Sequence, residues 1–247
     1  MGRTHSTDAI VLRAHDIGEA DRLCILLTED FGRIAARARA VRKLTSKNGG
    51  SILPLQYSTI DLAEGSAGYT VTRAVCKETH DVCRNNLACF LYAEQAVYLL
   101  MRHIEDRVPV PSLFVLLRDF LGACHYHSPK LLFSVFSLAF FHELGLLPSL
   151  RHSIVSHTAF THDDIIVLSK RWHGLCLYEE DAFGRVLSPA LLQALLHAVE
   201  HPFHDLSFFS SETTQEFIST AASLFEPGAI APLPVNVGSS SGVTPTW

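Results

Sequence analysis

Residues 28–47 read TEDFGRIAARARAVRKLTSK, and this stretch decides the fold because its residue types alternate. From position 33 to position 41, the odd positions read Arg, Ala, Arg, Arg, Val and the even positions read Ile, Ala, Ala, Ala. Successive side chains of a β-strand point to opposite faces. The stretch therefore predicts a strand over residues 32–41, with one cationic face and one small, apolar face.

Six cations lie along this strand and the loop that follows it. No acidic residue stands between Asp30 and Asp61, so the neighbouring sequence offers these cations no partner. Such a group attracts phosphates and releases their counterions, which is a main source of nucleic-acid affinity. The candidate nucleic-acid-binding residues are Arg33, Arg37, Arg39, Arg42, Lys43 and Lys47. Phe31 and Tyr57 are the nearest aromatic residues for base stacking, with a place in the core as the alternative.

The segments around this strand also have the pattern of short strands. Apolar runs near residues 9–14, 22–28, 52–62 and 69–77 are separated by breaks rich in Gly, Asp and Asn. Five short strands of this kind suit a small closed barrel, which leaves no exposed edge. Residues 1–80 are therefore predicted to form an OB-fold nucleic-acid-binding domain.

After residue 80 the apolar period becomes helical. Helices are predicted over residues 85–105, 111–123, 129–146 and 205–225, and one more is predicted to begin at Ser188-Pro189. Residues 150–183 lose this period and are predicted to form a small irregular insertion. The chain is thus predicted to be α+β, with an α-helical domain over residues 81–226. Residues 227–247 hold four prolines and three glycines and are predicted to be poorly ordered.

Composition and charge narrow the class of protein. The 247 residues are 48% hydrophobic and 18% charged, as in folded proteins rather than disordered ones. Residues 1–80 carry a net charge of +2 and residues 81–247 a net charge of −7, which indicates different partners for the two parts. The acidic part contains few cations with which to bind an acidic peptide: Lys130, Arg151, Lys170 and Arg171.

No targeting or membrane segment is recognised. The N-terminal residues lack the pattern of a signal peptide, and the longest apolar run, residues 131–147, is interrupted by Ser134, Ser137, His142 and Glu143. Six cysteines occur singly, which favours reduced thiols. A cytoplasmic protein without a membrane partner is expected.

Residues 9–43, AIVLRAHDIGEADRLCILLTEDFGRIAARARAVRK, resemble the RecO family of bacterial recombination mediators. The segments LACFLYAEQAVYLL, FHELGLLPSL and LSPALLQALL follow in the order expected for that family. The resemblance implies binding of single- and double-stranded DNA, strand annealing in recombinational repair, and help in loading recombinase onto coated strands. It also implies two protein partners, a RecR-like protein and single-strand-binding protein, and it implies neither a cofactor nor an enzyme activity.

The chain departs from the family at two places. Many members hold zinc with four cysteines in the region of the insertion, whereas this chain has Cys176 alone, with His152, His157, His162 and His173 nearby. No metal is predicted here, although a metal on these residues is left open. The glycine that usually precedes the basic cluster is replaced by Ala40.

Two other functions fit parts of the sequence. An RNA-binding OB module would use the same basic strand, because backbone electrostatics do not identify the sugar. A metal-dependent hydrolase would use the histidine-rich region. Separately, His197 and His201 could offer two metal ligands on one helical face. Phosphate-binding glycine loops and nucleophile motifs are absent, so no catalytic residue is predicted. Glu94 falls within an apolar helical stripe and is predicted to link barrel and helices through a buried polar contact.

Overall fold

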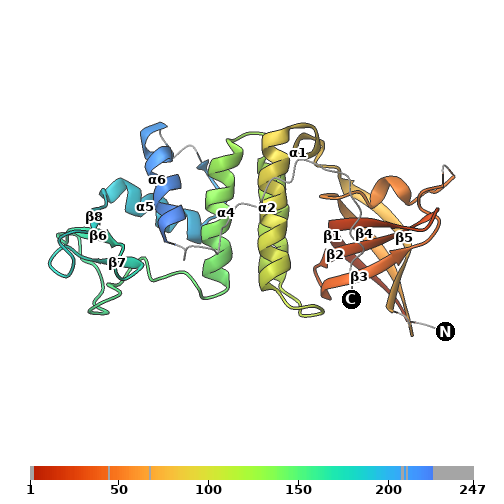
Figure 1. The fold of residues 1–247 in the computed structure, drawn as a ribbon, viewed down its shortest axis with the longest axis horizontal. Helices are drawn as coiled ribbons and strands as arrows, with labels where there is room; N and C mark the ends of the chain where they lie inside the picture. Colours follow the sequence, from red (N-terminus) through yellow and green to blue (C-terminus); the bar gives the residue numbers. More distant parts are fainter. Residues whose placement is uncertain (1–2, 44, 67, 207–208, 210, 225–247) are drawn as a thin grey trace, which may run out of the picture.

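The computed structural model describes residues 3–43, 45–66, 68–206, 209 and 211–224. A five-stranded barrel forms one end of the molecule, helices form the middle, and a small three-stranded sheet lies at the other end (Figure 1). The predicted α+β class is confirmed. The tail predicted to be poorly ordered, residues 227–247, lies outside the described residues.

The N-terminal barrel has the strand order of an OB-fold. Its strands are β1 (Thr4–Ile17), β2 (Asp21–Thr28), β3 (Gly32–Ala38), β4 (Tyr57–Gly65) and β5 (Gly68–Glu78). They close in the order β1-β2-β3-β5-β4, with β3 parallel to β5 and the other pairs antiparallel. All five predicted strands are present. The basic strand is shorter than predicted, because β3 ends at Ala38 rather than at residue 41.

Strand β1 separates two apolar cores because its side chains alternate. Ala9 and Val11 point into the barrel and join the core formed by Ile34, Ala36 and other buried residues. Ile10 and Leu12 are buried in the larger core that the helices form. Burial of apolar surface on both faces therefore fixes the register of β1 and fastens the barrel to the helices.

In the described part of the chain, six helices follow the barrel. They are α1 (Asp81–Asn85), α2 (Leu87–His103), α3 (Pro111–Ala123), α4 (Pro129–Glu143), α5 (Pro189–Glu200) and α6 (Ser211–Ser223). Helix α4 is buried from Leu131 to Phe141 and packs against α2, α3, α5 and α6, so it is the central helix. At the start of α5, Ser188 accepts a hydrogen bond from the Leu191 amide, as predicted for a cap before Pro189. Among the described residues, no helix is long and apolar enough to span a bilayer.

The insertion between α4 and α5 contains the small sheet. Its strands are β6 (Ile166–Ser169), β7 (Gly174–Leu177) and β8 (Arg185–Val186), paired antiparallel in the order β7-β6-β8. Ile166, Leu168 and Leu175 belong to the helical core, which anchors one face of the sheet. The insertion predicted to be irregular therefore contains a small antiparallel sheet.

Glu94 links the barrel to the helices, as predicted. Its carboxylate on α2 lies 2.5 Å from the Arg13 guanidinium on β1, and its side chain is 14% exposed. A partly buried carboxylate needs such a partner because its charge is otherwise costly to desolvate. The pair therefore neutralises a charge at the boundary between the two cores.

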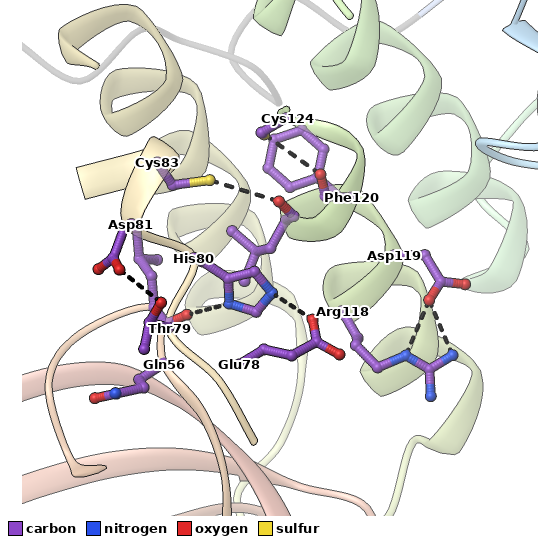
Figure 2. Close-up of polar contacts among 12 residues, drawn as sticks. Gln56, Glu78, Thr79, His80, Asp81, Cys83, Arg118, Asp119, Phe120 and Cys124 are labelled. Carbon is purple, nitrogen blue, oxygen red and sulfur yellow. Dashed lines mark hydrogen bonds and ion pairs between the residues drawn. The ribbon is translucent and has the colours of Figure 1, made fainter. Parts of the chain in front are cut away.

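His80 fixes the turn where β5 leads into α1 (Figure 2). Its buried ring places Nδ1 2.8 Å from the Leu55 carbonyl oxygen and Nε2 3.2 Å from the Glu78 carboxylate. A carbonyl oxygen only accepts, so Nδ1 donates to Leu55. Burial lowers the pKa of His80, and the Leu55 carbonyl and Glu78 partly oppose this shift. The histidine thus ties the end of the barrel to the first helix.

Candidate nucleic-acid interface

The two faces of β3 have the character that the alternation predicts. Ile34, Ala36 and Ala38 are buried inside the barrel, while Arg37 is exposed on the outer surface. The chain then turns at Ala40, whose φ of 54° lies in the left-handed region. Glycine adopts this conformation without steric cost, which accounts physically for the glycine usual at this position in the family.

Asp21 is the anchor of the basic strand and its turn. One oxygen of its carboxylate accepts the Ala40 amide at 2.8 Å, and the other accepts Arg37 Nε at 2.9 Å and Nη2 at 2.7 Å. The Ala40 amide, and then Arg37, hold the pKa of Asp21 below its usual range. The carboxylate therefore remains ionised at neutral pH and orients both the turn and the guanidinium. Asp21 thus acts as a turn carboxylate that binds a backbone amide.

Asp16 has the same role for Arg42. Its carboxylate lies 3.2 Å from Arg42 Nε and accepts Arg22 Nε at 2.9 Å. Arg42 also donates from Nη1 to the Gly18 carbonyl oxygen at 3.0 Å. Arg22, and then Arg42, lower the pKa of Asp16. The carboxylates on either side of the β1–β2 turn thus hold the loop that carries the basic residues.

Three of the six candidate cations are open to incoming phosphates. Arg39, Lys43 and Lys47 are exposed and make no ion pair within the described part of the chain. Arg37 and Arg42 are exposed beside them, each with one carboxylate partner. The interface defined by these five residues, here called the basic face, is positive because its cations outnumber Asp16 and Asp21. Their contact with nucleic acid stays a prediction.

Arg33 differs from the other five because it contacts the helical part of the chain. Its side chain is only 15% exposed, and Nε lies 2.5 Å from the Asp106 carboxylate. It also donates from Nη1 to the Met101 carbonyl oxygen, and its own carbonyl oxygen accepts the Arg107 amide at 2.9 Å. Arg33 therefore holds the α2–α3 connection against β3. Because its guanidinium is engaged by Asp106 and Met101, it contributes little to phosphate binding.

Gly32 permits this contact between β3 and the connection. It has φ of 64°, and a Cβ atom at this position would lie 2.0 Å from the Val108 carbonyl oxygen. Such a distance is far inside van der Waals contact. Gly32 thus allows β3 to approach the α2–α3 connection closely, and the contacts of Arg33 stabilise that approach.

The aromatic residues near the barrel face add little stacking surface. Tyr57 is buried against Phe114, and its hydroxyl donates to the Asp8 carboxylate at 2.7 Å. The ring of Phe31 is half-buried between His5, at 5.1 Å, and Tyr69, at 6.3 Å. Tyr57 is therefore a core residue, and the basic face itself presents charge rather than rings.

The histidine-rich insertion does not bring together a set of zinc ligands. Cys176 is fully buried in β7, whereas His152, His157, His162 and His173 are exposed. Within the described ranges, no group of three or more His, Cys, Asp or Glu side chains is arranged to hold a metal ion. On α5, His197 binds the His204 carbonyl oxygen at 2.7 Å through Nε2. The residues present therefore do not fit the zinc site that the family implies.

Carboxylate hydrogen bonds join the loops of the insertion instead. The Glu180 carboxylate accepts Ser153 Oγ at 2.5 Å and the Leu177 amide at 2.8 Å, so it connects two loops that are distant in sequence. Burial acts to raise the pKa of Glu180, but hydrogen bonds from Ser153, Ser156 and the Leu177 amide outweigh it and lower the pKa. The stability that this network contributes is fully present at pH values above the ordinary pKa of a glutamate. It is lost as the pH falls through the lowered pKa of Glu180.

We expect the insertion to be stable without zinc and to depend on Glu180. Elemental analysis of protein purified without added metal should find well under one zinc per chain, and a chelator should not change the melting temperature. Glu180→Gln should lower that temperature, because an amide accepts the two hydrogen bonds less strongly than a carboxylate. Glu179→Gln, at the exposed neighbouring residue, is the control. Stoichiometric zinc together with unfolding by the chelator would contradict the expectation.

Comparison with known proteins gives matches along most of the chain. Residues 1–80 match the family model described as "Recombination protein O N terminal", and residues 84–221 match "Recombination protein O C terminal". "DNA repair protein RecO" of Dehalococcoides mccartyi strain BAV1 is 35% identical over 152 residues, which cover 61% of this chain and 60% of that protein. The protein of the same name from Pelotomaculum thermopropionicum is 34% identical over 148 residues, covering 60% and 58%. The matched region thus spans about three fifths of the length of these relatives.

Proposed function

The chain belongs to the recombination protein O family, and on this premise we propose that it binds DNA and promotes strand annealing in recombinational DNA repair. The observation that carries the proposal is the basic face: five exposed cations on β3 and the loop after it in an OB-fold barrel, namely Arg37, Arg39, Arg42, Lys43 and Lys47. The carboxylates of Asp16 and Asp21 position this face without neutralising it. The relatives named as DNA repair proteins support the same proposal.

The chemistry of annealing on such a surface is electrostatic. Two complementary strands repel each other through their phosphates, and cations that bind both backbones reduce this repulsion. Base pairing then supplies the driving force, so the reaction needs neither nucleotide hydrolysis nor a catalytic side chain. The basic face recognises phosphate and does not read bases, which fits annealing of strands of any sequence.

We further propose that the helical part of the chain binds protein partners, a RecR-like protein and single-strand-binding protein. The four cations that the sequence offers for an acidic peptide are spread over the fold. Lys130 lies on α4, Arg151 at the start of the insertion, and Lys170 and Arg171 between β6 and β7. Of these, Arg151 lines a groove of about 580 Å³ between the insertion and α5. Leu150, Phe160, Leu192 and Leu196 give that groove apolar walls. Arg151 is paired with the Glu200 carboxylate, so an acidic segment with apolar residues would bind this groove by taking the place of Glu200.

An annealing assay with complementary strands, bare or coated with single-strand-binding protein, tests the proposal. The full chain should accelerate annealing of both. Arg151→Ala should slow annealing of coated strands several-fold and leave bare strands unaffected, because it removes the cation of the groove and no part of the basic face. Arg102→Ala, at an exposed cation of α2, is the control.

Two outcomes of this experiment would count against the proposal. Failure to anneal bare strands would remove the annealing function, and equal loss on bare and coated strands with Arg151→Ala would remove the groove as a docking site. Measuring the affinity of the chain for DNA and for RNA of the same sequence separates a role in DNA repair from an RNA-binding role. Clear preference for RNA would favour the latter.

A further inference from the structure

The β6–β7 hairpin of the insertion ends in four consecutive exposed residues of unusual composition. Lys170, Arg171, Trp172 and His173 connect Ser169 at the end of β6 to Gly174 at the start of β7. The Arg171 guanidinium lies over the Trp172 indole, 4.8 Å from the ring centroid. Two adjacent cations therefore border a large aromatic ring that is 43% exposed. This tip lies at the end of the molecule opposite the barrel (Figure 1).

A second aromatic ring, that of Phe183, is held to the same part of the insertion. Its side chain is fully exposed. The Asp181 carboxylate accepts the Phe183 amide at 3.2 Å and Ser169 Oγ at 2.5 Å, and Ser169 Oγ in turn accepts the Trp172 amide at 3.2 Å. One hydroxyl–carboxylate pair thus fixes the backbone of both aromatic residues. The two rings are therefore presented from an ordered framework.

The chemistry of this tip differs from that of the basic face. Exposed aromatic rings lose hydration when a flat partner stacks on them, and unpaired nucleobases are such partners. The neighbouring cations suit the phosphates between those bases. Of the carboxylates close in sequence, Glu180 and Asp181 are engaged in internal hydrogen bonds, while Glu179 is exposed. The tip thus combines the two groups that single-strand binders use, of which the basic face has only the cations.

We propose that Lys170, Arg171, Trp172 and Phe183 form a second site for single-stranded nucleic acid, here called the hairpin platform. Unpaired bases stack on the two rings, and Lys170 and Arg171 contact the phosphates. The inference rests on the proposed DNA-binding function, but it assigns the contact to a different part of the fold. Because bases within a duplex are already stacked, the platform discriminates single strands from duplexes. The basic face binds both.

Tryptophan fluorescence provides a direct test of the platform. The chain has two tryptophans, Trp172 and Trp247, so a full-length Trp247→Phe variant reports on Trp172 alone. Titration with oligo(dT) should quench its emission and saturate, since stacking brings thymine onto the indole. A duplex of the same length should leave the emission nearly unchanged.

Affinity measurements separate the platform from the basic face. Trp172→Ala combined with Phe183→Ala should weaken binding of oligo(dT) about tenfold and leave duplex affinity unaltered. Tyr126→Ala, at a ring that is 82% exposed outside the insertion, should change neither. Alanine at Arg37, Arg39 and Arg42 should weaken binding of both DNA forms yet preserve the quenching of Trp172 at saturating oligo(dT).

The proposal is overturned if Trp172 emission stays constant at concentrations of oligo(dT) that saturate binding by anisotropy. In that case the exposed rings serve a protein partner. Equal loss of single-strand and duplex affinity in the double variant would also overturn it. Failure of the full chain to bind any DNA would instead refute the proposed function, and the platform with it.

Discussion

Replacing Gly32 with alanine is expected to lower the free energy of unfolding by about 3–5 kcal/mol. The new Cβ would lie 2.0 Å from the Val108 carbonyl oxygen and 2.4 Å from its carbon, both backbone atoms that no rotamer change can move away. The left-handed φ of 64° adds conformational strain for any residue with a Cβ. The chain can relieve the overlap only by displacing the α2–α3 connection, which breaks the contacts of Arg33 with Asp106 and Met101.

Gly18 offers a matched control for this experiment. Its φ of 58° is nearly the same, but a Cβ there would have no atom within 4 Å. Gly18→Ala should therefore cost only about 1 kcal/mol, the conformational part alone. Urea denaturation of both variants measures the difference. Equal destabilisation by the two substitutions would show that the close approach of Gly32 to Val108 does not stabilise the fold.

Simultaneous replacement of Arg37, Arg39 and Arg42 by alanine is expected to weaken single-strand binding about 100-fold at 0.1 M salt. Each lost phosphate contact lowers the dependence of log affinity on log salt by about 0.7 for a single strand, which at this salt corresponds to about fivefold per contact. The variant also leaves Asp16 and Asp21 without Arg42 and Arg37, so their negative charges add to the loss. The effect should be similar for DNA of any sequence.

The fold of the triple variant should remain intact. The ion pairs that the substitutions remove, Arg37–Asp21 and Arg42–Asp16, lie at the surface, and surface ion pairs contribute little to stability. Arg118→Ala, at a cation of α3 that is paired with its neighbour Asp119, measures the effect of removing one positive charge outside the basic face. Full DNA affinity in the triple variant would remove the basic face from the binding site. A large drop in melting temperature would show that the arginines support the fold instead.

The barrel and the main helices were predictable because their signals are local. A period of two along residues 33–38 identified the buried face of β3, and Ser188-Pro189 identified the start of α5. These features depend on neighbouring residues alone, and the tertiary structure preserves them. The left-handed turn at Ala40 was not predicted, because the expected strand ran on to residue 41.

The partners of the basic residues could not be predicted in the same way. The absence of acids between residues 30 and 61 indicated six unpaired cations, but the fold brings carboxylates from other segments. Asp21 is 16 residues from Arg37, and Asp106 is 73 residues from Arg33. The contacts of Arg33 therefore arise from the docking of the α2–α3 connection, which no local pattern encodes. Likewise, the link between Trp172 and Phe183 depends on how the insertion folds.

The salt dependence of single-strand affinity tests the central claim, that the basic face binds DNA through phosphates. Anisotropy of labelled oligo(dT) should be titrated with the full chain, and with the Arg37, Arg39 and Arg42 alanine variant, over a range of salt concentrations. If about four to six phosphates are engaged, log affinity should fall with log salt at a slope of about −3 to −4, and the variant should reduce that slope by about 2. The same slope and affinity in both proteins would contradict the account.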